Sequence, residues 1–568
     1  MPKSHWRLMA ALTITAALAA HAAIPFARAQ EQQSTTGVIS AYAITGARIV
    51  TVSGANIERG TIVIRDGLIS AVGASTVAPA DARVIDGAGL TVYPGLIDSN
   101  TNLGIPAPAP SPARGGGGGG GAQTPAISSP NSAQPVGLQP EILATDFIRP
   151  GGDQLEAARN AGITAALTAP REGVFLGQSA LINLAGDTPQ EMIVRSPVAL
   201  HVGFTPLRTG GYPSSLMGVF SALRQMLLDA GRLRDANAIY ERTPRGTRRP
   251  VQDKSLVALF PVLAREMPVV MYADTEREII RALDLTHEFN LKTIIAGGLE
   301  SWKVSDRLRE SNVPVLLSLN FPKRTTADVP EADPDPLRVM RQRVEAPKTA
   351  GRLATARVRF AFQSGAMTSM SDFLANAEKA IENGLARDEA LRAMTIRPAE
   401  ILGVADRLGT IEVGKIANLT VTRGDIFDKK ASITHVFIDG RPVDLKPATE
   451  KEKGAAAAAS STAMASGTWT LKVKSEAGTD QTVTMILRQE GERVSGSLQG
   501  DYGPAQISGG SIDASGNLRF TARVTIGGQT TEATFTATIT GNEMRGTVQT
   551  VGSSPASFVG TKPQNSDE

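Results

Sequence analysis

The chain has 568 residues, of which 42% are hydrophobic and 20% are charged, and its net charge is +3. This length predicts two or three folded cores. Charges of both signs are dispersed and no basic run carries interleaved aromatic residues, so nucleic acid is not an expected partner. The chain contains no cysteine, which excludes disulfide bonds, thiolate metal ligands and a thiol nucleophile.

The N-terminal residues have the pattern of an export signal. Lys3 and Arg7 precede or begin an apolar stretch over residues 8–23, and an Ala-Arg-Ala sequence at 27–29 comes before a polar segment. The pattern predicts a signal peptide over residues 1–29. A membrane anchor is the alternative, but the apolar run is near or below the roughly 18–20 residues that a span requires. We expect a periplasmic or secreted protein with no membrane span after cleavage.

Short segments of alternating polarity, separated by turns such as Asp66-Gly67 and Asp439-Gly440, flank a long middle region. These are hairpin patterns. They predict one small composite β-sandwich assembled from residues 41–93 and 404–445. The segments are 43–52, 61–65, 68–72 and 83–86 at the start, and 417–422, 433–438 and 441–443 at the end.

Between the flanks, apolar β-branched runs alternate with amphipathic helical patterns, which favours parallel strands joined by helices. The helical spacing is clearest at 275–289 and 370–384. With a strand ending near Asp98 and another at 181–184, the strand count approaches eight. The middle region therefore predicts an α/β fold, a (β/α)8 TIM barrel over residues 94–403. The other expected strands are 164–168, 198–202, 269–272, 293–296, 313–319 and 358–362.

Two segments have low-complexity composition. Residues 105–137 contain proline-rich pieces and seven consecutive glycines, Gly115–Gly121, and predict a disordered insert at the end of the first barrel strand. Residues 446–467 have the composition of a linker. Residues 468–562 then alternate strongly between polar turns and apolar segments, which predicts a C-terminal all-β domain, either a small antiparallel barrel or a sandwich.

Several motifs together resemble a known family. The sequence Val84-Ile85-Asp86-Gly87 runs into Pro94-Gly95-Leu96-Ile97-Asp98, and residues 395–403 (TIRPAEILG) precede residues 408–415 (LGTIEVGK). Over residues 41–443 the chain resembles the amidohydrolase superfamily, specifically its exported imidazolonepropionase-like members. The resemblance implies a hydrolase of carbon–nitrogen bonds that uses Zn or another divalent metal.

In that family, chemistry depends on an H-x-H after strand one, a histidine after each of strands five and six, and an aspartate after strand eight. The metal lowers the pKa of its bound water toward about 7. The matching positions of this chain hold Asn100, Asn102, Tyr272, Gly297 and Gly365. A carboxamide is a weak, uncharged donor compared with imidazole. We expect these positions to line a pocket that binds no metal.

Few other polar residues are candidates for this pocket. His201 can line it near strand four, although a histidine with a purely structural role is the alternative. Asp98, Asp274 and Glu300 lie near strand ends, where carboxylates would suit Mg²⁺ or Ca²⁺ better than Zn²⁺, and Gln363 lies on strand eight. Each of these carboxylates can instead have a purely structural role. Asp98 can orient the backbone, Asp274 can cap the following helix, and Glu300 can simply be solvated.

These observations predict an exported amidohydrolase-like protein without metal-dependent activity. Its expected role is that of a non-catalytic binding or partner protein, with a small-molecule ligand or a catalytically complete relative as partner. The alternative is an active hydrolase of carbon–nitrogen (non-peptide) bonds, imidazolonepropionase-like, with an atypical site. A third possibility places the function in the C-terminal domain, with the barrel as its scaffold.

Overall fold

The chain divides into two compact units, Met1–Leu445 and Lys446–Glu568. The predicted signal peptide and the glycine-rich part of the insert, residues 107–128, lie outside the residues that the structure describes. Across the described ranges, no helix is both long enough and apolar enough to cross a membrane. The structure, a computed structural model, describes residues 41–106, 129, 132–207, 212–324, 335–365, 367, 369–445, 465–474, 480–490, 493–500, 503–512, 516–526, 529–550 and 556–562.

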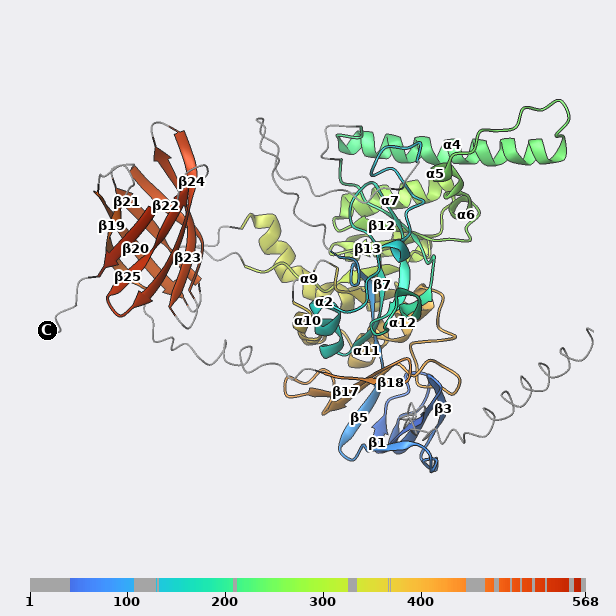
Figure 1. Cartoon of the computed structure of the whole chain (residues 1–568). Helices are drawn as coiled ribbons and strands as arrows, with labels where there is room; N and C mark the ends of the chain where they lie inside the picture. The colour runs from blue at the N-terminus through green and yellow to red at the C-terminus, as the bar shows by residue number, and fades with distance from the viewer. Residues whose placement is uncertain are drawn as a thin grey trace, which may run out of the picture. The chain divides into compact units, whose positions relative to one another are not determined.

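The two flanks of unit 1 form one eight-stranded sheet, in the order β18-β17-β16-β5-β1-β2-β3 with β4 paired to β1. The flanks meet where β16 runs antiparallel to β5, with Val421 opposite Val92, and the blue and orange strands lie side by side there (Figure 1). Segments more than 300 residues apart in the chain therefore share a ladder. The strands are β1 (Ala41–Ile49), β2 (Ile57–Arg65), β3 (Leu68–Gly73), β4 (Arg83–Asp86), β5 (Leu90–Pro94), β16 (Leu419–Arg423), β17 (Ser432–Ile438) and β18 (Arg441–Val443).

The middle of unit 1 is a TIM-barrel-like domain built from two sheets, β10-β9-β7-β6 and β15-β14-β13-β12-β11-β8. On one side the sheets meet where Ser99 Oγ donates to Phe362 O at 2.7 Å. On the other side only Ser179 separates β8 from β9. The strands are β6 (Leu96–Thr101), β7 (Ile163–Thr168), β8 (Phe175–Gln178), β9 (Ala180–Asn183), β10 (Ile193–Arg195), β11 (Leu200–Val202), β12 (Val269–Ala273), β13 (Thr293–Gly297), β14 (Val315–Ser318) and β15 (Phe360–Gln363).

One barrel strand runs against the expected direction. The segment expected at 181–184 is β9, which pairs antiparallel to β7, and β8 pairs antiparallel to β11. Only six residues join the end of β7 to the start of β8. A parallel crossover needs a dozen or more residues, so this short connection forces a reversal. A uniformly parallel eight-stranded barrel is therefore wrong at this position.

Helices pack around the barrel, and their ends follow local sequence signals. Helix α7 begins after Thr275, whose side chain accepts from Glu278 N while Glu278 accepts from Thr275 N at 3.0 Å, a capping box. Thr275, not Asp274, is therefore the cap. The helices are η1 (Ala144–Asp146), α2 (Asp153–Asn160), α3 (Pro189–Met192), α4 (Leu216–Arg242), α5 (Lys254–Val257), α6 (Phe260–Leu263), α7 (Glu276–Phe289), η2 (Ser301–Val304), α8 (Ser305–Glu310), α9 (Leu337–Thr355), α10 (Ser371–Glu382), α11 (Arg387–Met394) and α12 (Ile396–Ile401).

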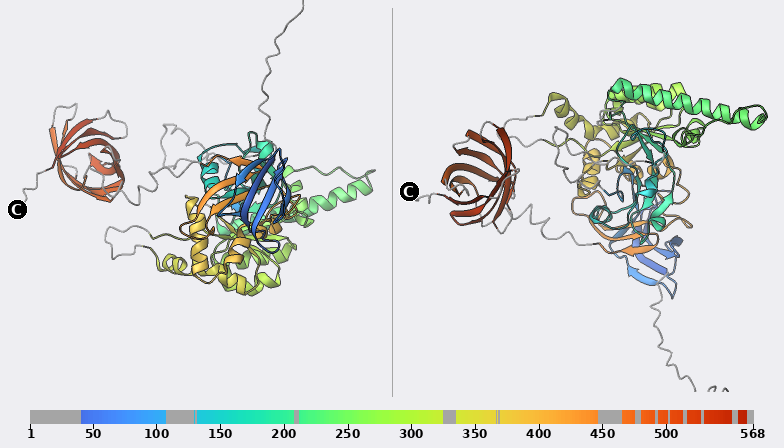
Figure 2. Two further views of the ribbon diagram at one scale, coloured as in Figure 1. Left: turned by 90° about the horizontal axis from the view of Figure 1, so that it is seen from below. Right: turned by 45° about the horizontal axis from the view of Figure 1, so that its top comes forward.

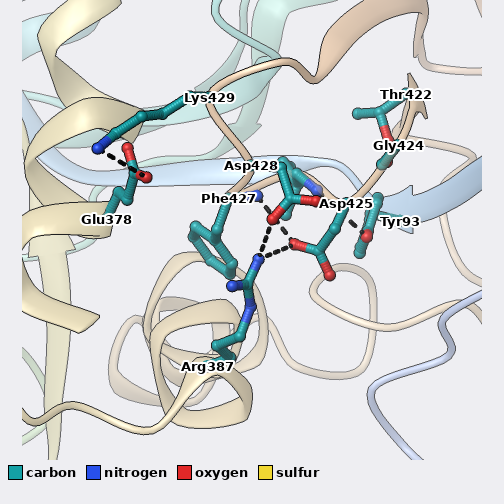
Figure 3. Close-up of polar contacts among 10 residues, drawn as sticks. Tyr93, Glu378, Arg387, Thr422, Gly424, Asp425, Phe427, Asp428 and Lys429 are labelled. Atoms are coloured by element: carbon teal, nitrogen blue, oxygen red, sulfur yellow. Dashed lines mark hydrogen bonds and ion pairs between the residues drawn. The ribbon is translucent and has the colours of Figure 1, made fainter. Parts of the chain in front are cut away.

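The loop between β16 and β17 ties the flanking sheet to the barrel helices (Figure 3). Arg387, at the start of α11, donates to Asp425 at 2.8 Å and to Asp428 at 2.7 Å. Lys429 lies 3.8 Å from Glu378 of α10. Apart from the half-buried Glu378, these side chains are exposed to solvent, so the pairs fix geometry more than they add stability.

The described flanks of the insert pack against the barrel. Ile105 is buried, and Ser132 Oγ lies 3.1 Å from Ser255 Oγ. Gln134 donates to Asp253 at 2.8 Å. Described residues near both ends of the predicted insert, 105–137, therefore make ordered contacts.

Unit 2 is a closed barrel of eight antiparallel strands in chain order, seen end-on in Figure 2. The sequence left a barrel and a sandwich open, and the structure is a barrel. Trp469 is fully buried in its core and donates from Nε1 to Ala465 O at 2.8 Å, so ordered packing begins within the predicted linker. The strands are β19 (Gly467–Lys474), β20 (Asp480–Glu490), β21 (Arg493–Gly500), β22 (Gly503–Ile512), β23 (Asn517–Ile526), β24 (Gln529–Thr540), β25 (Glu543–Thr550) and β26 (Ala556–Thr561).

Candidate functional site

The interior of the barrel in unit 1 changes from apolar to polar along the strands. Ile97, Val270, Ile294 and Leu316 belong to one buried apolar cluster. Because side chains on a strand alternate between two faces, Tyr272 lies on the same face of β12 as Val270, two residues further on. The polar side chains thus gather at the carboxyl ends of the strands, the face where barrels of this class place their sites.

Four polar side chains from four strands form one continuous chain of hydrogen bonds. Gln363 Nε2 donates to Leu316 O at 2.7 Å, and Gln363 Oε1 accepts from Asn100 Nδ2. Asn100 Oδ1 accepts from Tyr272 Oη at 2.9 Å. His201 Nδ1 lies 3.1 Å from the same hydroxyl. The candidates Asn100, Tyr272, His201 and Gln363 are thereby brought together.

The direction of this chain assigns the tautomer of His201. Tyr272 donates its only proton to Asn100, so its oxygen accepts the proton of His201 Nδ1. His201 Nε2 is left as an unprotonated acceptor, and this buried atom has no hydrogen-bond partner. Burial, with a smaller contribution from the charge of Arg171, lowers the pKa of His201 to about 3. The imidazole is therefore neutral near pH 7.

Asp98 lies beside the chain but points to the backbone. Its carboxylate accepts from Ser364 N at 2.9 Å, from Asn100 N at 3.3 Å and from Ser364 Oγ. Complete burial raises its pKa to about 6, although these hydrogen bonds oppose the shift. Asp98 thus holds the ends of β6 and β15 together, which is the structural alternative that the sequence left open.

The carboxyl group of Asp274 lies against Gly297, the residue at the position where the resemblance implies a histidine after strand six. Gly297 has a φ of +101°, and a Cβ built on it would collide with Asp274 Oδ1. Asp274 stays in contact with solvent, yet partial burial of its carboxyl, with Glu278 and Glu300 nearby, raises its pKa to about 6. Glu300 itself accepts from Glu276 N at 2.9 Å and pairs with Lys303 at 3.2 Å.

The sequence analysis missed Arg171, which follows β7 by three residues. Its Nη2 donates to the carbonyl of Gly365, a residue with a φ of +60°, and its Nε is buried without a partner. Its charge acts on Asp98, His201 and Tyr272, whose pKa values it lowers. The sequence could have identified Arg171 as a site candidate, because it lies just after the carboxyl end of a barrel strand.

The remaining expected positions lie at the edge of this arrangement. Asn102 follows the end of β6 and is partly exposed. Within the described parts of the chain, no group of three or more His, Cys, Asp or Glu side chains is placed to hold a metal ion.

Comparison with known proteins finds a family match for part of unit 1 and a structure of similar fold. Residues 332–443 match the family model described as "Amidohydrolase family". The structure is similar to an amidohydrolase from Thermotoga maritima, with a TM-score of 0.60 and 22% identity over 71% of this chain and 100% of that one. This similarity shows a shared fold.

Two further similarities are more limited. A prolidase complexed with N-methylphosphonate-L-proline gives a TM-score of 0.43 at 18% identity, over 72% of this chain and 100% of its own. An N-acetylglucosamine-6-phosphate deacetylase from Haemophilus influenzae is 45% identical over 58 residues, which are 10% of this chain and 15% of the relative. The chain thus matches under a sixth of that enzyme's length.

Proposed function

We propose that this protein is an exported, non-catalytic member of the amidohydrolase superfamily, imidazolonepropionase-like, that binds a small molecule at the mouth of its barrel. The partial family match and the similar structure of an amidohydrolase support descent of this fold from hydrolases. The observation that carries the proposal is the hydrogen-bonded chain from His201 to Gln363. Two of its members, Asn100 and Tyr272, stand where the family resemblance implies metal ligands, and these neutral groups bind each other instead. The predicted signal peptide is the basis for a periplasmic or secreted location.

The residues present do not fit the divalent metal that the family uses. Asn100 Oδ1 already accepts from Tyr272, and burial raises the pKa of Tyr272, which disfavours the phenolate that would bind a cation. Asp98 is held by Ser364. His201 Nε2 is then a single free imidazole nitrogen, whereas a catalytic zinc takes three protein ligands. We therefore propose a site that works without a metal.

A second candidate function is metal-independent hydrolysis of carbon–nitrogen (non-peptide) bonds. It is favoured by Asp274, which reaches solvent at the barrel mouth and has a pKa of about 6. A carboxyl that titrates near the working pH can transfer protons to or from a bound substrate. A catalytically complete relative as a partner remains a further proposal, since the barrel retains the fold without the family's ligands.

Metal analysis and turnover assays on the purified full chain test these proposals. We expect no stoichiometric Zn, Mn or Ni and no hydrolysis of cyclic amides. Stoichiometric metal at the barrel mouth contradicts the first proposal. Metal-independent turnover that Asp274→Asn abolishes, and that Asp187→Asn on the exposed surface leaves intact, identifies the second. N-terminal sequencing of the protein from the periplasmic fraction tests cleavage after Ala29.

A further inference from the structure

Helix α4 extends past the body of the barrel domain. Its last buried residue is Ala230, and the twelve residues that follow, up to Arg242, include none. Figures 1 and 2 show this end of the helix projecting away from the strands. The chain then turns back, and Gln252 Nε2 donates to Asn237 Oδ1 at 2.8 Å. Residues 231–252 therefore form a projection (the α4 projection) that packing in the core does not explain.

The α4 projection is strongly basic. It contains six arginines and two acidic residues, a net charge of +4, whereas the whole chain has a net charge of only +3. All six arginines are exposed, namely Arg232, Arg234, Arg242, Arg245, Arg248 and Arg249. In the part of the chain that the structure describes, Arg234 and Asp235, 3.5 Å apart, form the one ion pair that involves any of them. The projection therefore presents a concentrated positive charge to solvent.

The outward face of α4 also carries large apolar side chains. Met217, Leu228 and Ile239 are 83%, 59% and 52% exposed. They recur every eleven residues, which is close to three helical turns, so they lie along one line of the helix. The buried Val219 and Met226 lie on the opposite side. Helix α4 therefore has an apolar line facing solvent in addition to the face that it buries.

Arginine side chains lie beside these apolar residues. Arg232 is four residues beyond Leu228, and Arg242 is three residues beyond Ile239, spacings that place each pair on one side of the helix. At a membrane surface, arginine keeps its charged head at the level of the lipid phosphates while neighbouring apolar side chains enter the headgroup region. A helical partner would need an apolar residue every three or four positions, whereas this face has one every eleven. The pattern therefore favours a lipid surface over a helical partner.

We propose that the α4 projection binds the surface of a membrane that contains anionic phospholipids. Its arginines bind the lipid phosphates, and Leu228 and Ile239 enter the headgroup region. Each arginine at such a surface strengthens binding roughly fivefold. This contact goes beyond the proposed function, because it is separate from the site inside the barrel and does not require that site to bind a ligand.

Sedimentation with lipid vesicles tests the contribution of charge. The protein used lacks the predicted signal peptide, because the apolar residues 8–23 would enter a bilayer by themselves. We expect binding to vesicles made of phosphatidylglycerol and phosphatidylcholine in roughly equal parts, and none to phosphatidylcholine alone. The affinity should fall as the salt concentration rises. The triple variant Arg245→Gln/Arg248→Gln/Arg249→Gln should bind about a hundredfold more weakly.

A matched control removes the same charge from another part of unit 1. Arg59 of β2, Arg83 of β4 and Arg441 of β18 are exposed arginines of the flanking sheet, which lies at the opposite end of unit 1 from α4 (Figure 1). Replacing these three by Gln should leave the affinity within about twofold of the wild type, because salt screens distant charges. Circular dichroism confirms that both triple variants are folded.

The apolar contact has its own test, because a chain without cysteine can be labelled at one chosen position. A polarity-sensitive fluorophore on Ile239→Cys should shift its emission to shorter wavelength when anionic vesicles are added. The same label on Val77→Cys, which lies between β3 and β4 and is 82% exposed, should not shift. The double variant Leu228→Ser/Ile239→Ser should bind anionic vesicles severalfold more weakly than the wild type, with the same dependence on salt.

Three results would overturn the membrane contact, namely equal binding to the two kinds of vesicle, equal losses of affinity in the two triple variants, and an unshifted label at position 239. Binding to duplex DNA as tight as binding to anionic vesicles, with no effect of Leu228→Ser/Ile239→Ser, would overturn it in favour of a nucleic-acid surface. Release of the protein from vesicles by millimolar glycerol phosphate would overturn it in favour of a site for free phosphate esters.

Discussion

The hydroxyl of Tyr272 donates a hydrogen bond of 2.9 Å to the side-chain oxygen of Asn100. Both residues stand where the family resemblance implies metal-binding imidazoles, and here they bind each other. A hydroxyl and a carboxamide oxygen satisfied in this way replace metal coordination with a neutral link between β12 and β6. The barrel keeps its strand ends together by hydrogen bonds where related proteins can rely on a cation.

The first prediction concerns this link. Tyr272→Phe removes the hydroxyl and leaves Asn100 Oδ1 and His201 Nδ1 without partners, so we expect the free energy of unfolding of unit 1 to fall by about 1–3 kcal/mol. Urea denaturation measures this change. Tyr212→Phe removes the hydroxyl of a tyrosine that is 59% exposed and should leave stability unchanged. Equal effects of the two substitutions would show that the chain of hydrogen bonds contributes nothing.

The second prediction is a pair of opposite pH dependences. Burial raises the pKa of Asp98 from 3.8 to about 6, so between these values the folded state holds more protons and stability falls as pH rises. Burial lowers the pKa of His201 from 6.5 to about 3, so the unfolded state holds more protons there and stability rises with pH. The two contributions oppose each other between about pH 4 and 6.

Single substitutions should separate these contributions. Relative to the wild type, Asp98→Asn should make stability rise more steeply from pH 4 to 6, and His201→Gln should make it fall, each by roughly 3 kcal/mol at most. Urea unfolding at closely spaced pH values measures both slopes. Asp187→Asn serves as the exposed control. Parallel curves of stability against pH for all three variants would mean that burial shifts the pKa of neither Asp98 nor His201.

The sequence predicted the barrel strands well where burial alone determines them. The run at 269–272 became β12 and the amphipathic segment 275–289 became α7, because periodicity reports burial directly. The reversal at β9 was missed because strand direction depends on the length of a connection. Periodicity carries no information on direction, and the strand β8 (Phe175–Gln178) was not predicted, so the sequence did not reveal the short connection of six residues.

The candidate site could be predicted in part. The loss of histidines at Asn100 and Tyr272 is visible in the sequence. The role of Arg171 is not, since its partner Gly365 lies 194 residues away and the contact depends on the closure of the barrel. The collision between Asp274 and a side chain at position 297 likewise exists only in three dimensions.

The third prediction follows from that collision. Gly297→Ala places a Cβ against Asp274 and imposes a φ of +101° on an L-residue, so we expect a loss of roughly 2–4 kcal/mol. In the Asp274→Ala background the collision is gone and the backbone strain remains. The cost of Gly297→Ala should therefore be smaller but not zero in that background. Urea denaturation of the four proteins gives the coupling energy, and additive effects would contradict the contact.

The last prediction compares two glycines inside helices. Gly231 lies in α4, and a Cβ built on it meets nothing within 4 Å. Alanine is favoured over glycine in a helix interior by about 1 kcal/mol, so Gly231→Ala should raise the stability of unit 1 by about 0.5–1 kcal/mol. Gly351 lies in α9 and is buried, and a Cβ there would come within 3.0 Å of the backbone of Gly384.

Gly351→Ala should therefore destabilise unit 1 despite the same gain in helix propensity, because rigid backbone cannot move aside for the added methyl group. Thermal unfolding followed by Trp302 fluorescence reports on unit 1, provided that Trp469 of unit 2 is replaced by Phe in every protein compared and that the proteins lack residues 1–29, which contain Trp6. Opposite shifts in Tm are expected for the two substitutions. A stabilising Gly351→Ala would show that α9 and the segment after α10 are not packed as closely as the structure has them.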